Sequence, residues 1–413
     1  MKGFFKDART IQRMGEGPLG GYLVAFAQQL QAKGYAKPSI RRKLQMAAAF
    51  SQWLNRKHIQ AHQLTLQHIS GYLLSRGRAG FRPHRSDRAA LLQVLELLRE
   101  RSVTTEHIPQ PSLTPSGRLL EDYDLYLRKE RSLALATRIC YRPFVQQFLG
   151  DRFGSGPTDL TTLRASDVLT FVQRNAGRLR GKRVHLVTAA LRSFLQFARY
   201  RCQITLDLAA CVPTVASWSL STLPKSLPPA QVAQVLACCN QQSPLGKRDY
   251  AILLLLARLG LRAGEVARLT LEDLDWESGC ITVHGKMGRV DQLPLPTDVG
   301  TAIVAYLKGG RPHQSGTRRL FLRFAAPLCG FAGQKAVGSV VKRALAKAGI
   351  DSPRKGAHQF RHTLASELLR KGHSLSEIGE ILRHRSPDTT AIYAKVDLRS
   401  LRSLALRWPG GER

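Results

Sequence analysis

The stretch HQFRHTLASELL places three basic groups, His358, Arg361 and His362, at the start of an expected helix. Leu364 and Leu368 follow at helical spacing and form its apolar side. Residues three positions apart share a helix face, so the polar ends of His358 and Arg361 lie together. A helix N-terminus also attracts anions through its free N–H groups. The pattern predicts an anion site here, although His358 taken alone is more often a histidine packed in the core.

Three further motifs contain groups that could act on such an anion. LGLRAGEVARL places Arg262 at a helix start, with Glu265 three residues later, where its carboxylate can hold the guanidinium. HGKMGR sets Lys286 at the tip of an expected hairpin, between two glycines. LRHRSPDTTAIYAKV contains His384 and Tyr393. Surface ion pairs, turn lysines and core tyrosines are each common, so the motifs are specific only together and in this order.

Taken together, these motifs resemble the active site of the tyrosine recombinases, the phage integrase and Xer-like family. The resemblance extends over about 225–400, through GLRAGEVARLTLEDLDW, VHGKMGRVDQLPLP, HQFRHTLASELL and EILRHRSPDTTAIYAKV, and the helical unit at 113–210 resembles the family's core DNA-binding domain. One departure is Arg383, which stands where a glycine usually precedes the histidine. The resemblance implies a catalytic set, with Glu265 supporting Arg262, that consists of Arg262, Lys286, His358, Arg361, His384 and Tyr393.

These residue types suit transfer of a phosphodiester. Arg262 and Arg361 can clamp the charge that builds up on the phosphate oxygens in the transition state. A phenol has a pKa near 10, so Tyr393 has to lose its proton as it attacks, and His358 is the expected base. Lys286 can protonate the leaving 5′-oxygen. The resemblance further implies a 3′-phosphotyrosyl intermediate, which preserves the bond energy for rejoining.

Charge favours a polyanionic partner along the whole chain. The 413 residues include 63 Lys and Arg against 29 Asp and Glu, a net charge of +34. The excess is spread over the N-terminal, middle and C-terminal segments rather than confined to a tail. We therefore expect every domain to contact double-stranded DNA.

The remaining composition predicts a cytoplasmic protein without a cofactor. The longest apolar run, YAILLLLA, is too short to cross a bilayer, and the first residues lack the apolar core of a signal peptide, so no membrane association is expected. The seven cysteines form no C-x-x-C pair and fit a reducing compartment. No zinc-type spacing or phosphate-binding GxxxxGK[ST] loop occurs, so neither a metal nor a nucleotide is expected.

Two Pro- and Ser-bearing stretches, His107–Gly117 and Cys211–Pro229, divide the chain. They predict an N-terminal helical DNA-binding domain at 1–108, a core-binding helical domain at 113–212 and a catalytic domain with a C-terminal tail helix at 223–413. The fold class is mostly α with a small β component, namely SAM-like helical domains followed by an α+β tyrosine-recombinase domain.

The sequences of the first two predicted domains indicate two copies of one helical unit. Leu23–Leu54 aligns with Leu119–Leu149, each a helix, a break and a basic helix that ends in aromatic and leucine residues. Gln63–Leu74 then aligns with Asp159–Val172, each a capped turn leading into an apolar helix. Duplication is the favoured interpretation, and generic helical patterning is the alternative.

The third domain mixes a hairpin with helices. CITVHGKMGRVDQLPLP, residues 280–296, predicts two strands around a Gly-bounded turn. Apolar periodicity predicts helices at 229–239, 247–260, 337–348, 359–370 and 375–382.

The sequence predicts a site-specific recombinase or integrase, of a mobile element, acting as a homotetramer on two DNA sites, possibly with a related recombinase. A type IB topoisomerase-like relaxing enzyme and a catalytically idle DNA-binding accessory protein are the alternatives. Beyond Tyr393, an apolar stripe ends at Trp408 and has to dock somewhere. Docking on its own domain is one option, and the family resemblance suggests docking on a neighbouring protomer.

Overall fold

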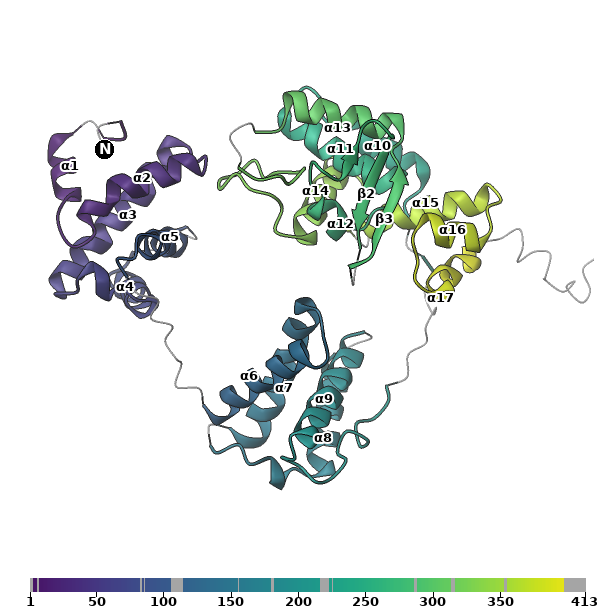
Figure 1. Cartoon of the computed structure of the whole chain (residues 1–413), viewed down its shortest axis with the longest axis horizontal. Helices are drawn as coiled ribbons and strands as arrows, with labels where there is room; N and C mark the ends of the chain where they lie inside the picture. Colours follow the sequence, from purple (N-terminus) through teal and green to yellow (C-terminus); the bar gives the residue numbers. More distant parts are fainter. Residues whose placement is uncertain are drawn as a thin grey trace, which may run out of the picture. The chain divides into compact units, whose positions relative to one another are not determined.

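The computed structural model of the chain describes residues 3–5, 7–81, 84, 86–104, 114–154, 156–179, 182–215, 223–224, 226–285, 288–312, 316–352 and 355–396. Contacts divide the chain into two units, 108–221 and the combination of 1–107 with 222–413. The described residues are mainly helical with one three-stranded sheet, which confirms the predicted fold class (Figure 1). No helix in the described ranges is both long and apolar enough to cross a membrane.

The first segment is a helical domain around its own apolar core. Leu30, Phe50 and Leu91 are fully buried in this core, and Phe50 packs against Tyr72 with ring centroids 4.9 Å apart. The helices are α1 Ala8–Met14, α2 Leu23–Ala32, α3 Lys37–Arg56, α4 Leu66–Arg78 and α5 Asp87–Glu100, with a 3₁₀ turn Ala61–Gln63 before α4.

The second segment repeats this succession of elements. Its helices surround an aromatic core in which Tyr123 and Phe194 pack edge to face. As in the first segment from α2 onward, a 3₁₀ turn separates two helices from two more, which matches the predicted alignment. Helix α1 has no counterpart among the described helices of the second segment, and duplication itself stays a prediction. The elements are α6 Pro115–Lys129, α7 Leu135–Phe153, a turn Leu160–Thr162, α8 Ala165–Arg178 and α9 Lys182–Tyr200.

The third segment is built on a large core between helices and a small sheet. Strands β1 Leu274–Asp275, β2 Cys280–His284 and β3 Val290–Pro294 pair antiparallel, with β2 in the centre. Cys280 lies opposite Pro294 and His284 opposite Val290, which confirms the predicted hairpin. Alternate residues of β2, Ile281 and Val283, are fully buried and give the sheet its apolar face.

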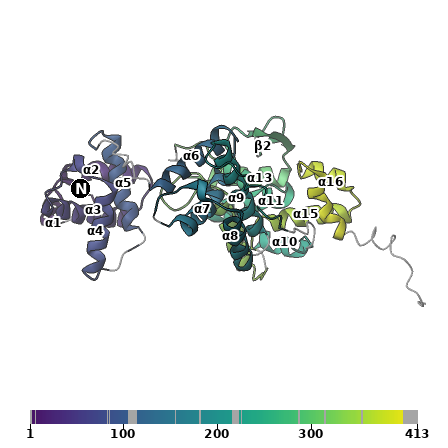
Figure 2. The ribbon, with the colours of Figure 1, turned by 90° about the horizontal axis from the view of Figure 1, so that it is seen from below.

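Helices cover this sheet and extend the domain toward the C-terminus. Helix α11 begins three residues earlier than predicted because Ser243 caps it and Pro244 suits its first turn. Helix α16 lies beside α15 in both views (Figure 2). The elements are α10 Pro229–Ala237, α11 Pro244–Arg258, α12 Ala263–Arg268, α13 Thr297–Gly309, α14 Gln334–Lys347, α15 His358–Arg370, α16 Leu375–Ile381, α17 Pro387–Ala391 and the 3₁₀ helix η5 Ile392–Val396.

Candidate active site

Arg262 is fixed by the turn that starts α12. The Glu265 carboxylate accepts hydrogen bonds from the backbone N–H and from Nη1 of Arg262, both at 2.8 Å. Glu265 is only 3% exposed, whereas the Arg262 side chain keeps about a third of its surface open. The buried carboxylate therefore holds the guanidinium at the protein surface, which confirms the predicted Arg262–Glu265 pair.

Arg361 joins this turn to the end of α16. Its Nη1 donates to the Gly260 carbonyl at 2.6 Å, and its Nη2 donates to the Leu382 carbonyl. Gly260 has a φ of +56°, and a Cβ there would lie 2.9 Å from the Leu382 side chain, so the close approach requires glycine. Burial, with the charges of Arg262 and Arg383, lowers the pKa of Arg361 to about 10, so the group stays charged at neutral pH.

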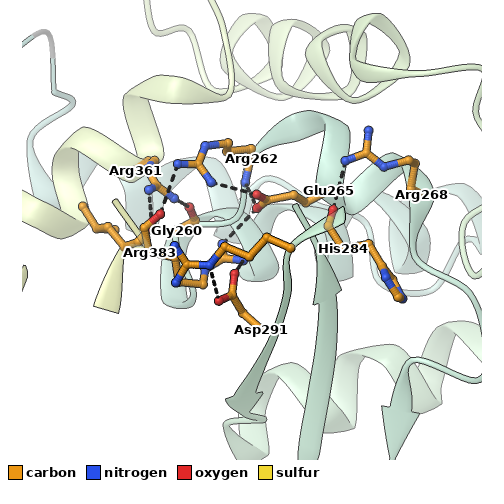
Figure 3. A network of polar contacts seen from close by, with 10 residues as sticks. Gly260, Arg262, Glu265, Arg268, His284, Asp291, Arg361 and Arg383 are labelled. Carbon is orange, nitrogen blue, oxygen red and sulfur yellow. Dashed lines mark hydrogen bonds and ion pairs between the residues drawn. The ribbon is translucent and has the colours of Figure 1, made fainter. Parts of the chain in front are cut away.

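A third guanidinium, that of Arg383, lies in the same network (Figure 3). It is 5% exposed and its Nη2 donates to Glu265 at 2.9 Å. Burial alone would raise the pKa of Glu265, but the backbone hydrogen bond from Arg262 and the Arg383 charge outweigh it, so the pKa is lowered. Arg383 was noted in the sequence as a departure and was not predicted to belong to the site.

Tyr393 is held inside the domain. Its side chain is 2% exposed, and its hydroxyl lies 2.9 Å from Nδ1 of His362. Burial raises the pKa of Tyr393 to about 12, and the Arg361 charge offsets only part of that rise. His362 thus contacts the expected nucleophile. It belonged to the basic cluster for which the sequence predicted an anion site, but it was not in the predicted catalytic set.

Two histidines flank these groups. Nδ1 of His384 lies 2.6 Å from the Thr390 hydroxyl. Burial, and then the charges of Arg361 and Arg262, lower the pKa of His384 to about 4, so its imidazole is neutral at neutral pH. His358 is the exposed first residue of α15, with its ring centroid 6.1 Å from that of His362.

The arrangement combines permanent positive charge with a phenol and neutral imidazole, which suits binding and attack of a phosphodiester. In the described part of the chain, no cluster of His, Cys, Asp and Glu side chains could hold a metal ion.

Residues 225–399 match the phage integrase family, and 120–201 match the phage integrase N-terminal SAM-like domain. A putative integrase/recombinase, y4rA of Sinorhizobium fredii (strain NBRC 101917 / NGR234), is 49% identical over 412 residues, 99% of each chain. The chain belongs to the phage integrase family. It is a tyrosine recombinase, an enzyme of site-specific DNA breakage and rejoining. Tyrosine recombinase XerD of Listeria monocytogenes serotype 4b (strain F2365) is 30% identical over 286 residues, 67% of this chain and 94% of its own.

Solved structures show the same fold for this recombinase. XerH bound to palindromic difH in a post-cleavage complex matches with a TM-score of 0.55 and 20% identity, over 69% of this chain and 83% of its own. The Tn1549 transposon integrase with a circular intermediate DNA matches with a TM-score of 0.51 and 20% identity, over 70% and 99%. Both likenesses support the assignment of an α+β recombinase domain preceded by a SAM-like domain.

The structure brings four of the six predicted catalytic residues together. Arg262 and Arg361 belong to the hydrogen-bonded arginine network. His384 and Tyr393 lie close enough to Arg361 for its charge to act on their pKa values. His358 lies one helical turn from His362, at the open end of α15. Lys286 falls outside the described residues, and the strands on either side of it are formed as predicted. The catalytic role of each residue stays a prediction.

Proposed function

We propose that this recombinase cleaves a DNA strand through Tyr393 and rejoins it through a 3′-phosphotyrosyl intermediate. One observation carries the proposal: two adjacent residues of α15 connect the arginines that would bind the phosphate to the tyrosine that would attack it. Arg361 extends into the arginine network, and His362 contacts the Tyr393 hydroxyl at 2.9 Å. A phosphate bound by the arginines would therefore lie close to the nucleophile's segment.

The proposed step balances within these residues. The phenol oxygen of Tyr393 forms a bond to phosphorus as the bond to the 5′-oxygen breaks. The phenol proton passes to His358, and Lys286 supplies a proton to the leaving oxygen. Arg262 and Arg361 stabilise the charge on the non-bridging oxygens. Neutral His384 adds a hydrogen-bonding group without another positive charge.

The buried nucleophile implies a movement before cleavage. At 2% exposure, the Tyr393 hydroxyl cannot contact a phosphate of a DNA duplex. In the DNA-free state its pKa of about 12 keeps the phenol protonated. We infer that η5 moves on DNA binding, which breaks the His362 contact and brings the hydroxyl to the phosphate.

The biological setting that we propose is strand exchange for a mobile element, in the cytoplasm, by a homotetramer on two DNA sites. One structural relative is the integrase of a transposon, and another relative is named an integrase/recombinase. These names support the mobile-element part of the setting, whereas the cytoplasm and the homotetramer are proposed from the sequence.

The tail after Tyr393 is part of this proposal. The apolar stripe from Leu398 to Trp408 lies outside the described residues, and we propose that it docks on a neighbouring protomer. Truncation after Asp397 is then expected to leave single-site binding intact and to abolish paired-site complexes on native gels. Paired-site complexes formed by the truncated protein would place the tail on its own domain.

A suicide substrate tests the proposed chemistry. DNA from the native recombination site, nicked so that the cleaved end diffuses away, is incubated with the full chain and separated on a denaturing gel. We expect a covalent adduct that protease treatment converts to a phosphotyrosyl-linked DNA end. Covalent capture on DNA of random sequence would favour a relaxing topoisomerase. No capture on any DNA would favour an accessory protein.

A further inference from the structure

Arg383 occupies a backbone position that is unfavourable for its residue type. Its φ of +55° lies in the left-handed region, which glycine adopts without strain. The residue is only 5% exposed, and its Nε and Nη1 have no hydrogen-bond partner among the described residues. Burial of a guanidinium is unfavourable unless ionic and hydrogen-bonding partners compensate it. The protein therefore holds a positive charge at a place where both the backbone and desolvation oppose it.

The main partner of Arg383 is the carboxylate that also holds Arg262. Nη2 of Arg383 donates to Oε2 of Glu265 at 2.9 Å, and Nη1 of Arg262 donates to Oε1 at 2.8 Å. Figure 3 shows both guanidiniums directed at this one carboxylate. Asp291 lies 3.9 Å from Nη1 of Arg383, but it is already paired with Arg289 at 2.7 Å. The two guanidiniums thus share the single charge of Glu265.

This sharing changes the net charge of the arginine network. The guanidiniums of Arg262, Arg361 and Arg383 contribute three positive charges. The Glu265 carboxylate contributes one negative charge, so the net charge is +2. After burial, the charges of Arg262 and Arg383 lower the pKa of Arg361, each by more than Glu265 raises it. The field around the two arginines that would bind the phosphate is therefore positive, and Arg383 supplies part of it.

We propose that Arg383 is a positioning residue that offsets the charge of Glu265, so that this carboxylate can fix Arg262 without cancelling its attraction for the phosphate. A carboxylate alone would hold the Arg262 guanidinium in place and at the same time weaken its field. Because salt screens buried charges less than exposed ones, the contribution of Arg383 persists at physiological ionic strength. The inference rests on the proposed function, in which Arg262 and Arg361 bind the scissile phosphate.

The test compares two suicide substrates that differ by one charge. One has the ordinary scissile phosphate, and the other has a methylphosphonate, in which a methyl group replaces one non-bridging oxygen and removes the negative charge. Cleavage is measured with protein below saturation, so that both rates are counted from free protein and free DNA. We expect Arg383→Met to lower the ratio of phosphate to methylphosphonate rates roughly tenfold, the scale of one charge acting at close range in a protein. Arg383→Lys keeps the charge and is expected to restore most of the ratio.

Asp291 provides a test of sign. Asp291→Asn removes a negative charge that lies 3.9 Å from the Arg383 guanidinium, so the field at the phosphate becomes more positive. We expect this variant to raise the ratio, which is the opposite of the effect of Arg383→Met. A ratio that falls in Asp291→Asn would show that the contacts of Arg383 matter and its charge does not.

Controls separate the possible failures. A variant that only folds poorly lowers both rates and leaves their ratio unaffected. Arg383→Gly suits the left-handed backbone and gives a second uncharged variant with an unstrained main chain. Arg343→Ala removes an exposed positive charge that is paired with Asp249 at 3.1 Å, and it is expected to keep the wild-type ratio. An unchanged ratio in both Arg383→Met and Arg383→Gly overturns the inference. If wild-type protein cleaves neither substrate, the proposed chemistry itself fails.

Discussion

Arg262 and Tyr393 are held by apolar cores of very different size. The segment of Arg262 follows α11, whose run Ile252–Leu256 is fully buried in the large core between the helices and the sheet. Tyr393 belongs to a small cluster whose other buried members are Ala365, Ile378 and Leu382. Tyr393, the proposed nucleophile, is thus itself a large part of the core that holds its own segment.

This difference suggests a division of labour within one site. A phosphate clamp works best when its donors are already in place, and a large core supplies that rigidity. A nucleophile that has to move works best in a segment with few buried contacts, because such segments open at small free-energy cost. Arg361 connects the two regions through the Gly260 and Leu382 carbonyls.

The largest expected effect comes from removing the nucleophile alone. Tyr393→Phe keeps the buried ring and the arginines, so we expect covalent DNA capture to be abolished while DNA affinity stays within a few-fold of wild type. Denaturing gels measure capture, and native gels measure affinity. Residual phosphotyrosine adduct in this variant would show that another residue attacks.

Cutting the link between the two regions is expected to have the next largest effect. Arg361→Ala removes a proposed transition-state donor, and loss of such a donor typically lowers the rate of the chemical step by about 10² or more. It also leaves two carbonyls without their donor, at about 1–3 kcal/mol for each buried group. Single-turnover cleavage and thermal unfolding measure the two effects. Near-normal cleavage kinetics would remove Arg361 from the site.

The sequence predicted the local elements of both regions better than the contacts between distant segments. The hairpin and α15 follow from apolar periodicity and turn glycines, and the Arg262–Glu265 pair follows from its spacing of three on one helix. In such local patterns the sequence spacing alone fixes which residues lie together, so the predicted elements were correct to within a few residues.

The contacts that the sequence did not predict join distant segments. His362 and Tyr393 are 31 residues apart, and Arg383 and Glu265 are 118 apart, so no periodicity relates them. The direction of the Arg383 side chain depends on its left-handed backbone. The one available signal was an arginine in place of the usual glycine, and it marked the position without indicating its partner.

A smaller effect is expected when only the contact between His362 and the Tyr393 hydroxyl is removed. His362→Phe preserves ring volume and leaves the buried Tyr393 hydroxyl unpaired, which weakens the closed segment by about 1 kcal/mol or more. Hydrogen exchange of 387–396 is therefore expected to accelerate up to roughly tenfold, while 251–268 stays protected. Ser366→Ala, one turn along α15, removes a hydroxyl that has no hydrogen bond among the described residues and serves as the control. Equal acceleration in both regions would contradict the division between them.

The smallest expected effect is the loss of thermal stability that His384 causes as the pH falls. His384 has a folded-state pKa of about 4, below its ordinary value of 6.5, because burial and the arginine charges disfavour its protonated form. A depressed pKa gives stability that is present above pH 6.5 and is lost as pH falls toward 4. His384→Gln has no such titration, so between pH 7 and pH 5 the wild-type Tm is expected to fall roughly 2 °C further than that of the variant. Hydrogen exchange at pH 5 locates the loss, which we expect in 387–396, where Thr390 binds the imidazole, and not in α11. A wild-type Tm that follows the variant's across this range would show that the arginines do not act on His384, and would separate the nucleophile segment electrostatically from the clamp.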